Sequence, residues 1–380
     1  MKRIALLFLP FGRACSRSAM FKQVWHRSLL FAVFSFSHFL PFATAQTEVS
    51  NFVPGSTLEG VNYFLPQTAL RITVVCEKTL TTPGELNKYA FRYLRLNDVP
   101  TAASTAWSIK DVTIEPYGVP DKAKAYNVKV KSKTVAPLVS LTHDGLLLAI
   151  NTEAAEESLP ALPQSVPAPA LPNPRQYMNQ EILSAGSTAK MAELCAQEIY
   201  DIRDSRNALV RGEADNTPKD GQQLQLMLAQ LDTQAQALES LFCGTRQTST
   251  EVFSLVYLPT QETERDLLFR FSQISGVVDR DDLSGQPVYI SVRNTGSLPQ
   301  RQENPETDKK KAKMEKGIYY NVPAREAISI FDLGKTYQQM ECSMGQFGYT
   351  EILSDVLFDK KPTTRVTLFQ DNGGLKKLEQ

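Results

Sequence analysis

Histidine is scarce in this sequence, which limits the chemistry it can support. Only three of the 380 residues are histidines, and only His143 lies beyond residue 45. Charge-relay hydrolysis and His-rich metal sites need a histidine held by other groups in a packed cleft. His143 instead precedes Asp144-Gly145, a pair typical of a tight turn. We therefore expect an exposed turn histidine, and both kinds of site are disfavoured.

Glycine and cysteine form no recognisable motif. The glycines have no phosphate-binding spacing, and adjacent carboxylates such as Asp281-Asp282 point apart in a strand and define no acid-base pair. The spacing of the cysteines beyond residue 45 matches no zinc or redox motif. We expect no cofactor. Buried free thiols and a disulfide between Cys195 and Cys243 both fit the sequence. These cysteines are Cys76, Cys195, Cys243 and Cys342.

Long apolar runs are absent beyond residue 45, so no later segment should span a bilayer. From Met20 the sequence has a basic start, an apolar stretch over 29–42 and the small residues Ala43-Thr44-Ala45, the pattern of a secretory signal. A membrane anchor is the alternative, but about 14 apolar residues interrupted by His38 and Pro41 fall short of the roughly 20 required. We expect residues 1–45 to be removed.

The start of translation stays open between Met1 and Met20. Residues 1–19 hold a second basic start and a short apolar run that ends near Cys15, as a lipoprotein signal would. Arg13 argues against lipidation, because a charge is out of place so close to the modified cysteine.

Neither sign of charge dominates the sequence, which has 41 basic and 41 acidic residues. The first 45 residues hold six basic and no acidic residues, so their removal leaves 35 against 41 and a net charge near −6. This balance argues against nucleic acid as a partner. The one basic run, Lys309-Lys310-Lys311, follows acidic residues and fits a solvated loop.

What the sequence does contain is a repeated tract. GVNYFLP at 60–66 returns as GIYYNVP at 317–323, and each copy leads into an alternating apolar run typical of a strand. The echo predicts an α+β fold with two related, sandwich-like β units at 46–157 and 313–380. Residues 246–312 hold further strands and a polar loop that could complete the first unit. Strands are expected at 69–77, 126–132, 135–142, 146–151, 251–258, 267–272, 288–293, 327–333 and 365–369, and a short helix within 84–96.

A linker and two helices are expected between the β units. Residues 158–176 are rich in proline among small residues, which favours an extended linker or a long exposed loop. Within 177–245, apolar residues follow helical spacing from Met191 to Leu209 and again from Leu224 to Phe242. The short connection predicts antiparallel neighbours, an inserted helical hairpin.

Two weak candidate sites stand out. Tyr63 and Tyr320, one from each tract, could form a carbohydrate-stacking platform, although alternation places at least one aromatic side chain of each copy in the core. Asp279, Asp281 and Asp282 supply the oxygen ligands that calcium favours. Because the helix-loop-helix calcium pattern fails at its fifth and twelfth positions, a polar turn is the better interpretation.

Several tracts resemble one family. GVNYFLPQTALRITVVCEK, TTPGELNKYAFRYLRLNDV, DGLLLAIN, LLFRFSQISGVVDRDDLSGQPVYISV and KGIYYNVPAREAISI, in this order, resemble an exported-protein family of Bacteroidota known as domain-of-unknown-function family 4831. The resemblance covers about Gly60 to Leu375. It implies a Gram-negative envelope location, periplasmic or at the outer membrane, and supplies no functional residue. Arg95 departs from the family, where a small residue such as glycine is expected.

The expected function follows from location and architecture. An exported chain without an anchor, with a proline-rich spacer and a long helical hairpin, suits a non-enzymatic binding or scaffold component of a periplasmic or outer-membrane protein complex. The alternative is a glycan-binding module or a carbohydrate-active enzyme. The β architecture and the tyrosines favour this alternative.

Overall fold

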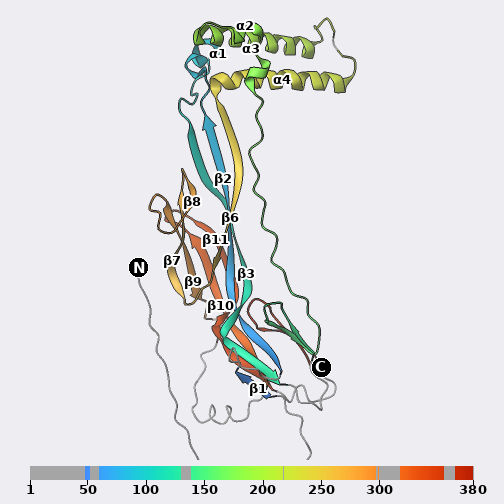
Figure 1. Ribbon diagram of the computed structural model, residues 1–380, viewed down its shortest axis with the longest axis vertical. Helices are drawn as coiled ribbons and strands as arrows, with labels where there is room; N and C mark the ends of the chain where they lie inside the picture. Colours follow the sequence, from blue (N-terminus) through green and yellow to red (C-terminus); the bar gives the residue numbers. More distant parts are fainter. Residues whose placement is uncertain are drawn as a thin grey trace, which may run out of the picture. The chain divides into compact units, whose positions relative to one another are not determined.

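Apolar residues that alternate along the chain after the first tract form β2 (Val61–Thr82), a strand of 22 residues. The computed structural model describes residues 48–51, 60–129, 138–216, 218–296, 298, 317–354 and 364–379. In this part antiparallel β-sheet predominates (Figure 1). β2 lies in a sheet of order β1-β3-β2-β6. Its other strands are β1 (Glu48–Asn51), β3 (Ser104–Lys129) and β6 (Thr245–Tyr257).

The second tract begins a strand of a different sheet. Its strand, β10 (Gly317–Phe331), belongs to a five-stranded sheet of order β11-β10-β9-β7-β8. The partners are β7 (Thr263–Ser272), β8 (Gly276–Val278), β9 (Gln286–Asn294) and β11 (Thr336–Ser354). β7 to β9 therefore join the C-terminal strands, whereas β6 joins the N-terminal ones.

A third sheet combines strands that follow β3 with strands at the C-terminal end of the described chain. Its order is β13-β12-β5-β4, from β4 (Val139–Leu141), β5 (Leu147–Ile150), β12 (Arg365–Leu368) and β13 (Leu375–Glu379). Strands expected in separate units thus pair with each other, and Ala45–Gln380 forms one compact unit. The expected hairpin around His143 is present, because β4 pairs with β5 and Gly145 N donates to Thr142 O at 3.0 Å.

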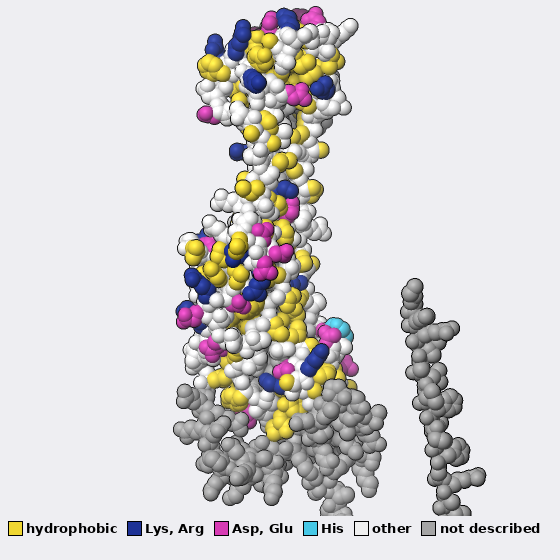
Figure 2. Space-filling model, turned by 60° about the vertical axis from the view of Figure 1, so that its left-hand side comes forward, with side chains coloured by type: hydrophobic (Ala, Val, Ile, Leu, Met, Phe, Trp, Pro, Cys, Tyr) yellow, Lys and Arg dark blue, Asp and Glu magenta, His cyan; other side chains and the backbone are white. Residues whose placement is uncertain are grey.

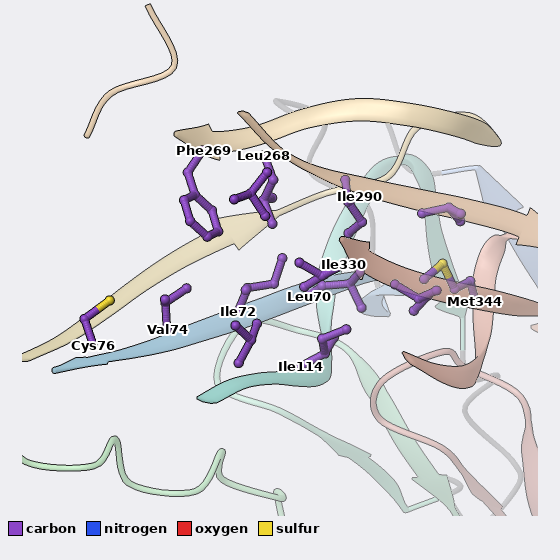
Figure 3. Close-up of a cluster of buried hydrophobic side chains, with 14 residues drawn as sticks. Leu70, Ile72, Val74, Cys76, Ile114, Leu268, Phe269, Ile290, Ile330 and Met344 are labelled. Atoms are coloured by element: carbon purple, nitrogen blue, oxygen red, sulfur yellow. The ribbon is translucent and has the colours of Figure 1, made fainter. Parts of the chain in front are cut away.

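The largest core lies between the first two sheets. Figure 3 shows side chains of β2 and β3 facing those of β7, β9, β10 and β11. Burying each such aliphatic side chain contributes roughly 1.5–3 kcal/mol, so this core is the main tie between the sheets. Its labelled members are Leu70, Ile72, Val74, Cys76, Ile114, Leu268, Phe269, Ile290, Ile330 and Met344.

The two tracts meet in a smaller core. Tyr63 is fully buried, and its hydroxyl accepts a hydrogen bond from Tyr319 N at 3.0 Å. The ring of Tyr126 stacks on that of Tyr319, with 4.3 Å between ring centroids, and Ile318 is buried in the same cluster. The two tracts therefore pack against each other in one core.

A buried polar junction joins β2, β10 and the turn after β12. The side chain of Asn321 is fully buried, and its Nδ2 donates to Pro66 O and to Asn372 O at 2.9 Å each. Its backbone N donates to Gly373 O at 3.0 Å, and Lys124 Nζ donates to its Oδ1 at 3.4 Å. We call these residues the Asn321 junction.

The helices pack on one another and on the chain before β3. α3 (Thr188–Arg211) and α4 (Gly221–Cys243) share a core with α1 (Ala90–Leu94) and α2 (Gln180–Leu183). Two short 3-10 helices, Asn87–Tyr89 and Pro174–Tyr177, flank this group. Arg203 of α3 pairs with Glu239 of α4, whereas Arg206, later in α3, pairs with Asp232, which comes earlier in α4. The two helices are therefore antiparallel.

Arg95 ends α1 in a left-handed conformation with φ of 57°. This conformation favours glycine, since a Cβ atom is strained there. The position at which this sequence differs from the expected family pattern is therefore the C-cap of α1. The backbone N of Arg95 still donates to Phe91 O at 3.2 Å.

The proline-rich segment runs as extended chain beside β6 (Figure 1). Val166 and Thr250 exchange two backbone hydrogen bonds of 2.9 and 2.8 Å, and Ser165 Oγ accepts from Val252 N at 3.2 Å. Prolines cannot donate to a further strand, so the segment covers part of an edge that would otherwise be open to pairing.

None of the described helices is long and apolar enough to cross a membrane. Figure 2 shows basic and acidic side chains interspersed over the described part of the visible face. The basic run at 309–311 lies outside the described residues, as does the expected signal segment.

Candidate binding site at the tips of three loops

Three connections meet at one end of the five-stranded sheet, beside Trp107 of β3. They are the β7–β8 turn at 273–275, the β8–β9 loop at 279–285 and the β10–β11 turn at 332–335. Side chains from all three line one pocket together with residues of β3, β7 and β9. We call this pocket and its three loops the loop-tip site.

The β10–β11 turn is fixed by Asp332. Its Oδ1 accepts from Gly334 N at 2.6 Å and from Lys335 N at 2.7 Å, and its Oδ2 accepts from the Tyr337 hydroxyl at 2.6 Å. Burial opposes ionisation of Asp332, but these hydrogen bonds prevail and lower the pKa of its carboxyl. Burial and the hydrogen bond to Asp332 raise the pKa of Tyr337, which therefore stays a neutral donor.

The β8–β9 loop is a compact polar turn. Asp282 N donates to Asp279 O at 3.1 Å, and Asp282 Oδ1 accepts from Ser284 N at 2.9 Å. Arg270 of β7 fixes the loop, because its Nε donates a hydrogen bond to Arg280 O at 2.7 Å. The carboxyl of Asp282 is thus used to cap the turn, and hydrogen bonds from Ser284 lower its pKa.

The β7–β8 turn positions the indole of Trp107. Ser272 Oγ accepts from Ile274 N and from Ser275 N at 3.3 Å each, and Trp107 N donates to Gln273 O at 2.8 Å. Gly276 has φ of 79°, and a Cβ atom there would lie 3.0 Å from the indole. Glycine is required here both for the backbone conformation and for the close approach to the ring.

The pocket has a volume of about 460 Å³. Its aromatic and aliphatic lining comes from Trp107, Ile109, Phe271, Val288 and Tyr337. Polar groups at its wall come from Ser108, Gln273, Ser284, Gln286, Asp332 and Lys335. Apolar and polar groups thus contribute about equally to the lining, and polar groups that can fix the orientation of a ligand are typical of a binding site.

Large aliphatic side chains project from each of the three loops. Ile274 is 74% exposed, Leu283 is 81% exposed and Leu333 is 73% exposed. Ile274 lines the pocket itself, and the other two are sequence neighbours of Ser284 and Asp332, which also line it. We call these three exposed side chains, on loops that contribute to the pocket, the apolar rim; exposed apolar groups of this kind are typical of a surface that binds a partner.

The residues proposed from the sequence lie elsewhere, with one exception. Tyr63 is buried and Tyr320 is half-buried, so no described tyrosine platform faces solvent at the two tracts. Asp279, Asp281 and Asp282 do belong to the loop-tip site. Among the described residues, no group of three or more His, Cys, Asp or Glu side chains is placed to hold a metal ion.

The remaining sequence candidates are structural or solvent-exposed. The four cysteines of the described chain are free, with Cys195 buried and Cys243 exposed. The side chain of His143 is 75% exposed, and its Nδ1 lies 2.7 Å from Glu156 Oε1. The hydrogen bond to Glu156 raises the pKa of this histidine.

The loop-tip site as a whole could not be predicted from the sequence, although a signal was present. An isolated large aliphatic residue inside a polar turn occurs three times, at Ile274, Leu283 and Leu333. A single one would be unremarkable, because scattered apolar residues are normal on surfaces. Only the fold shows that the three turns lie together.

Comparison with known proteins supports one assignment. The model of a family described as a domain of unknown function, DUF4831, matches residues 59–376. No curated protein and no solved structure matches the chain. Since the match spans nearly all of the described residues, the chain belongs to the DUF4831 family.

Proposed function

We propose that this protein is an exported, non-enzymatic component of the cell envelope that binds a partner protein through the loop-tip site, within a periplasmic or outer-membrane complex. The observation that carries the proposal is the exposure of Ile274, Leu283 and Leu333 around one pocket. Covering an aliphatic side chain of this size contributes roughly 1.5–3 kcal/mol, so three of them form an effective centre of binding.

The polar groups of the site suit orientation rather than catalysis. The side chains of Asp332 and Tyr337 are hydrogen-bonded to each other, and the carboxyl of Asp282 accepts a hydrogen bond from Ser284 N within its own turn. Lys335 Nζ lies 4.5 Å from the centroid of the Tyr337 ring, where it can turn toward an acidic group of a partner. The site thus combines an apolar rim with charges at its wall, as protein interfaces do.

Serine substitutions at the three tips test this proposal. The triple variant Ile274→Ser, Leu283→Ser, Leu333→Ser is expected to reduce recovery of the crosslinked partner from intact cells by at least about tenfold. A matched control replaces Leu138, Leu162 and Leu171, exposed aliphatic residues outside the site, with serine and is expected to keep the partner. Equal recovery by both variants, or no stable envelope partner for the parent protein, would contradict the proposal.

Export is supported by the signal-like pattern that ends at Ala45. Mass spectrometry of the protein isolated from its host is expected to find a mature chain that begins at Gln46. A chain that retains residues 20–45 would rule out cleavage at this place. An origin in the Bacteroidota belongs to the same proposal and rests on the family resemblance.

We also propose that the two tracts derive from one duplicated β unit and that α3 and α4 form a helical hairpin inserted between its copies. Both tracts enter a strand, and the strand pairing shifts its register close to the proline of each, at Leu65 just before Pro66 and at Pro323 itself. If the units are related, residues 60–78 and 317–335 should superpose with Pro66 on Pro323. Superposition at another offset would contradict the duplication.

Glycan binding is the second candidate, and one observation favours it. The pocket presents Trp107 and Tyr337 beside the amide side chains of Gln273 and Gln286, groups that can stack on and hydrogen-bond to a sugar. A glycan array with the parent protein and Tyr337→Ala separates the two candidates, since a protein-binding rim predicts no signal on the array.

A further inference from the structure

The outer surface of α4 lacks charge over most of its length. Between residues 222 and 236 the one charged side chain is Asp232, which is 42% exposed, whereas the exposed side chains of α3 carry several charges of both signs. Asp232 and Glu239, the only charged residues of α4, are paired with Arg206 and Arg203 of α3. The exposed residues of this stretch of α4 are Gln222, Gln223, Gln225, Leu226, Met227, Ala229, Gln230 and Gln236.

A solvent-facing helix normally presents charged residues on its outer side. The centres of protein interfaces are instead depleted in charge and enriched in methionine and large apolar residues. On α4, Leu226 is 71% exposed and Met227 is 37% exposed. This surface therefore has the composition of an interface, although within the described chain Leu226 is left largely uncovered and Met227 partly so.

One stripe of α4 is close to symmetric along the helix. Gln222, Leu226, Ala229, Thr233 and Gln236 follow each other at steps of four and three residues and so share one side of the helix. Ala229 is at the centre, with a glutamine seven residues away on either side. In an antiparallel pair of α4 helices, Gln222 of one copy would face Gln236 of the other.

The chemistry of this stripe suits a second copy of the same chain. A glutamine amide both donates and accepts hydrogen bonds. Two identical glutamines that face each other can therefore pair, whereas two identical charges would repel. The small side chain of Ala229 lets two helix axes approach at the centre. An uncharged surface gives no electrostatic attraction to an acidic or a basic partner.

We propose that α4 docks in antiparallel fashion against α4 of a second copy of this chain, about a two-fold axis that passes near Ala229. A two-fold contact uses the same patch on both copies, as this stripe allows. About 15 residues of helix span roughly 22 Å and bury on the order of 700 Å² in total, less than the 1,200 Å² of a stable complex. The dimer therefore forms at high local concentration and dissociates on dilution.

Charge substitutions at the axis test the proposal. By sedimentation velocity, the mean mass of the parent protein is expected to rise toward twice the monomer mass with increasing concentration. Ala229→Glu and Ala229→Lys should each stay monomeric, because the same charge then meets itself at the axis. An equimolar mixture of the two should recover the dimer. Asn207→Glu, an added charge on the exposed side of α3, is the matched control and should behave as the parent does.

Circular dichroism and melting of each variant show whether α4 remains folded. Glutamate and lysine are good helix formers and Ala229 is exposed, so both variants should match the parent. A parent protein that stays monomeric at every concentration overturns the proposal. Dimerisation of Ala229→Glu at the concentrations at which the parent dimerises also overturns it. So does an equimolar mixture of folded Ala229→Glu and Ala229→Lys that fails to associate, a result that would assign α4 to a different partner.

Discussion

Replacing Asn321 with alanine is expected to lower the free energy of unfolding by about 3 to 4 kcal/mol. The side chain is fully buried, and its Nδ2 satisfies the carbonyl oxygens of Pro66 and Asn372 at 2.9 Å each. Alanine removes both donors and leaves two buried carbonyl groups without a partner, which costs about 1 to 3 kcal/mol for each group. Urea unfolding followed by intrinsic fluorescence measures the loss.

Two further variants sharpen this prediction. Asn321→Asp keeps the shape but sets a carboxyl oxygen against the two carbonyl oxygens, so it should destabilise the protein at least as much as alanine does. Asn207→Ala, at an exposed position of α3, should change the free energy of unfolding by less than about 0.5 kcal/mol. A loss below about 1 kcal/mol for Asn321→Ala would show that the junction is not important for stability.

The Asn321 junction connects the turn after β12 to β2 and β10. Asn321 lies on β10, Pro66 on β2, and Asn372 and Gly373 in the turn between β12 and β13. One side chain therefore ties together elements of all three sheets. Nearby, Gly345 of β11 approaches so closely that a Cβ atom would lie 2.5 Å from Asn321 Nδ2. The glycine is required because the backbone of β11 must pass directly over this amide.

Parts of the fold could be predicted from local pattern, and parts could not. The alternation after the first tract correctly indicated β2, and Asp144-Gly145 correctly indicated the hairpin of β4 and β5. β11 was missed because it is polar and contains Gly345 and Gly348, which usually argue against a strand. Both glycines are explained by close backbone contacts that no sequence pattern reveals.

β3 was expected only near its end, for a related reason. Its middle contains Pro116 and Pro120, which are normally excluded from the interior of a sheet. Within the described residues β1 pairs only with Tyr126–Lys129, so no described strand borders β3 at the two prolines on the side away from β2. The same limit applies to the candidate site, because the meeting of three turns depends on strand order rather than on any motif.

Glu326 is a buried carboxyl that should make the stability of the protein depend strongly on pH. Its side chain has no exposed surface, and burial together with the charge of Glu262 raises its pKa from 4.5 to about 7. Asn294 Nδ2 donates to Oε1 at 3.1 Å, while Oε2 has no hydrogen-bond partner within the described chain. The neutral acid is therefore the form that the fold favours.

The direction of the effect follows from proton binding. Between about pH 4.5 and 7 the folded protein keeps a proton that the unfolded chain releases, so stability falls as the pH rises through this window. The full difference is about 3 kcal/mol. Glu326→Gln is uncharged at every pH and loses this dependence. We expect the variant to be no more stable than the parent at pH 5 and more stable at pH 8, a change of about 2.5 kcal/mol in their difference.

Denaturant unfolding of both proteins at the two pH values measures this change, and the other titrating groups cancel in the comparison. Glu341→Gln, an exposed carboxyl on the neighbouring strand β11, is the matched control and should leave the pH dependence unchanged. A parent and a Glu326→Gln variant that differ by the same amount at pH 5 and pH 8 would mean that Glu326 is ionised in the folded protein. In that case Oε2 must have a partner that satisfies its charge, because an unpaired buried carboxylate costs several kcal/mol.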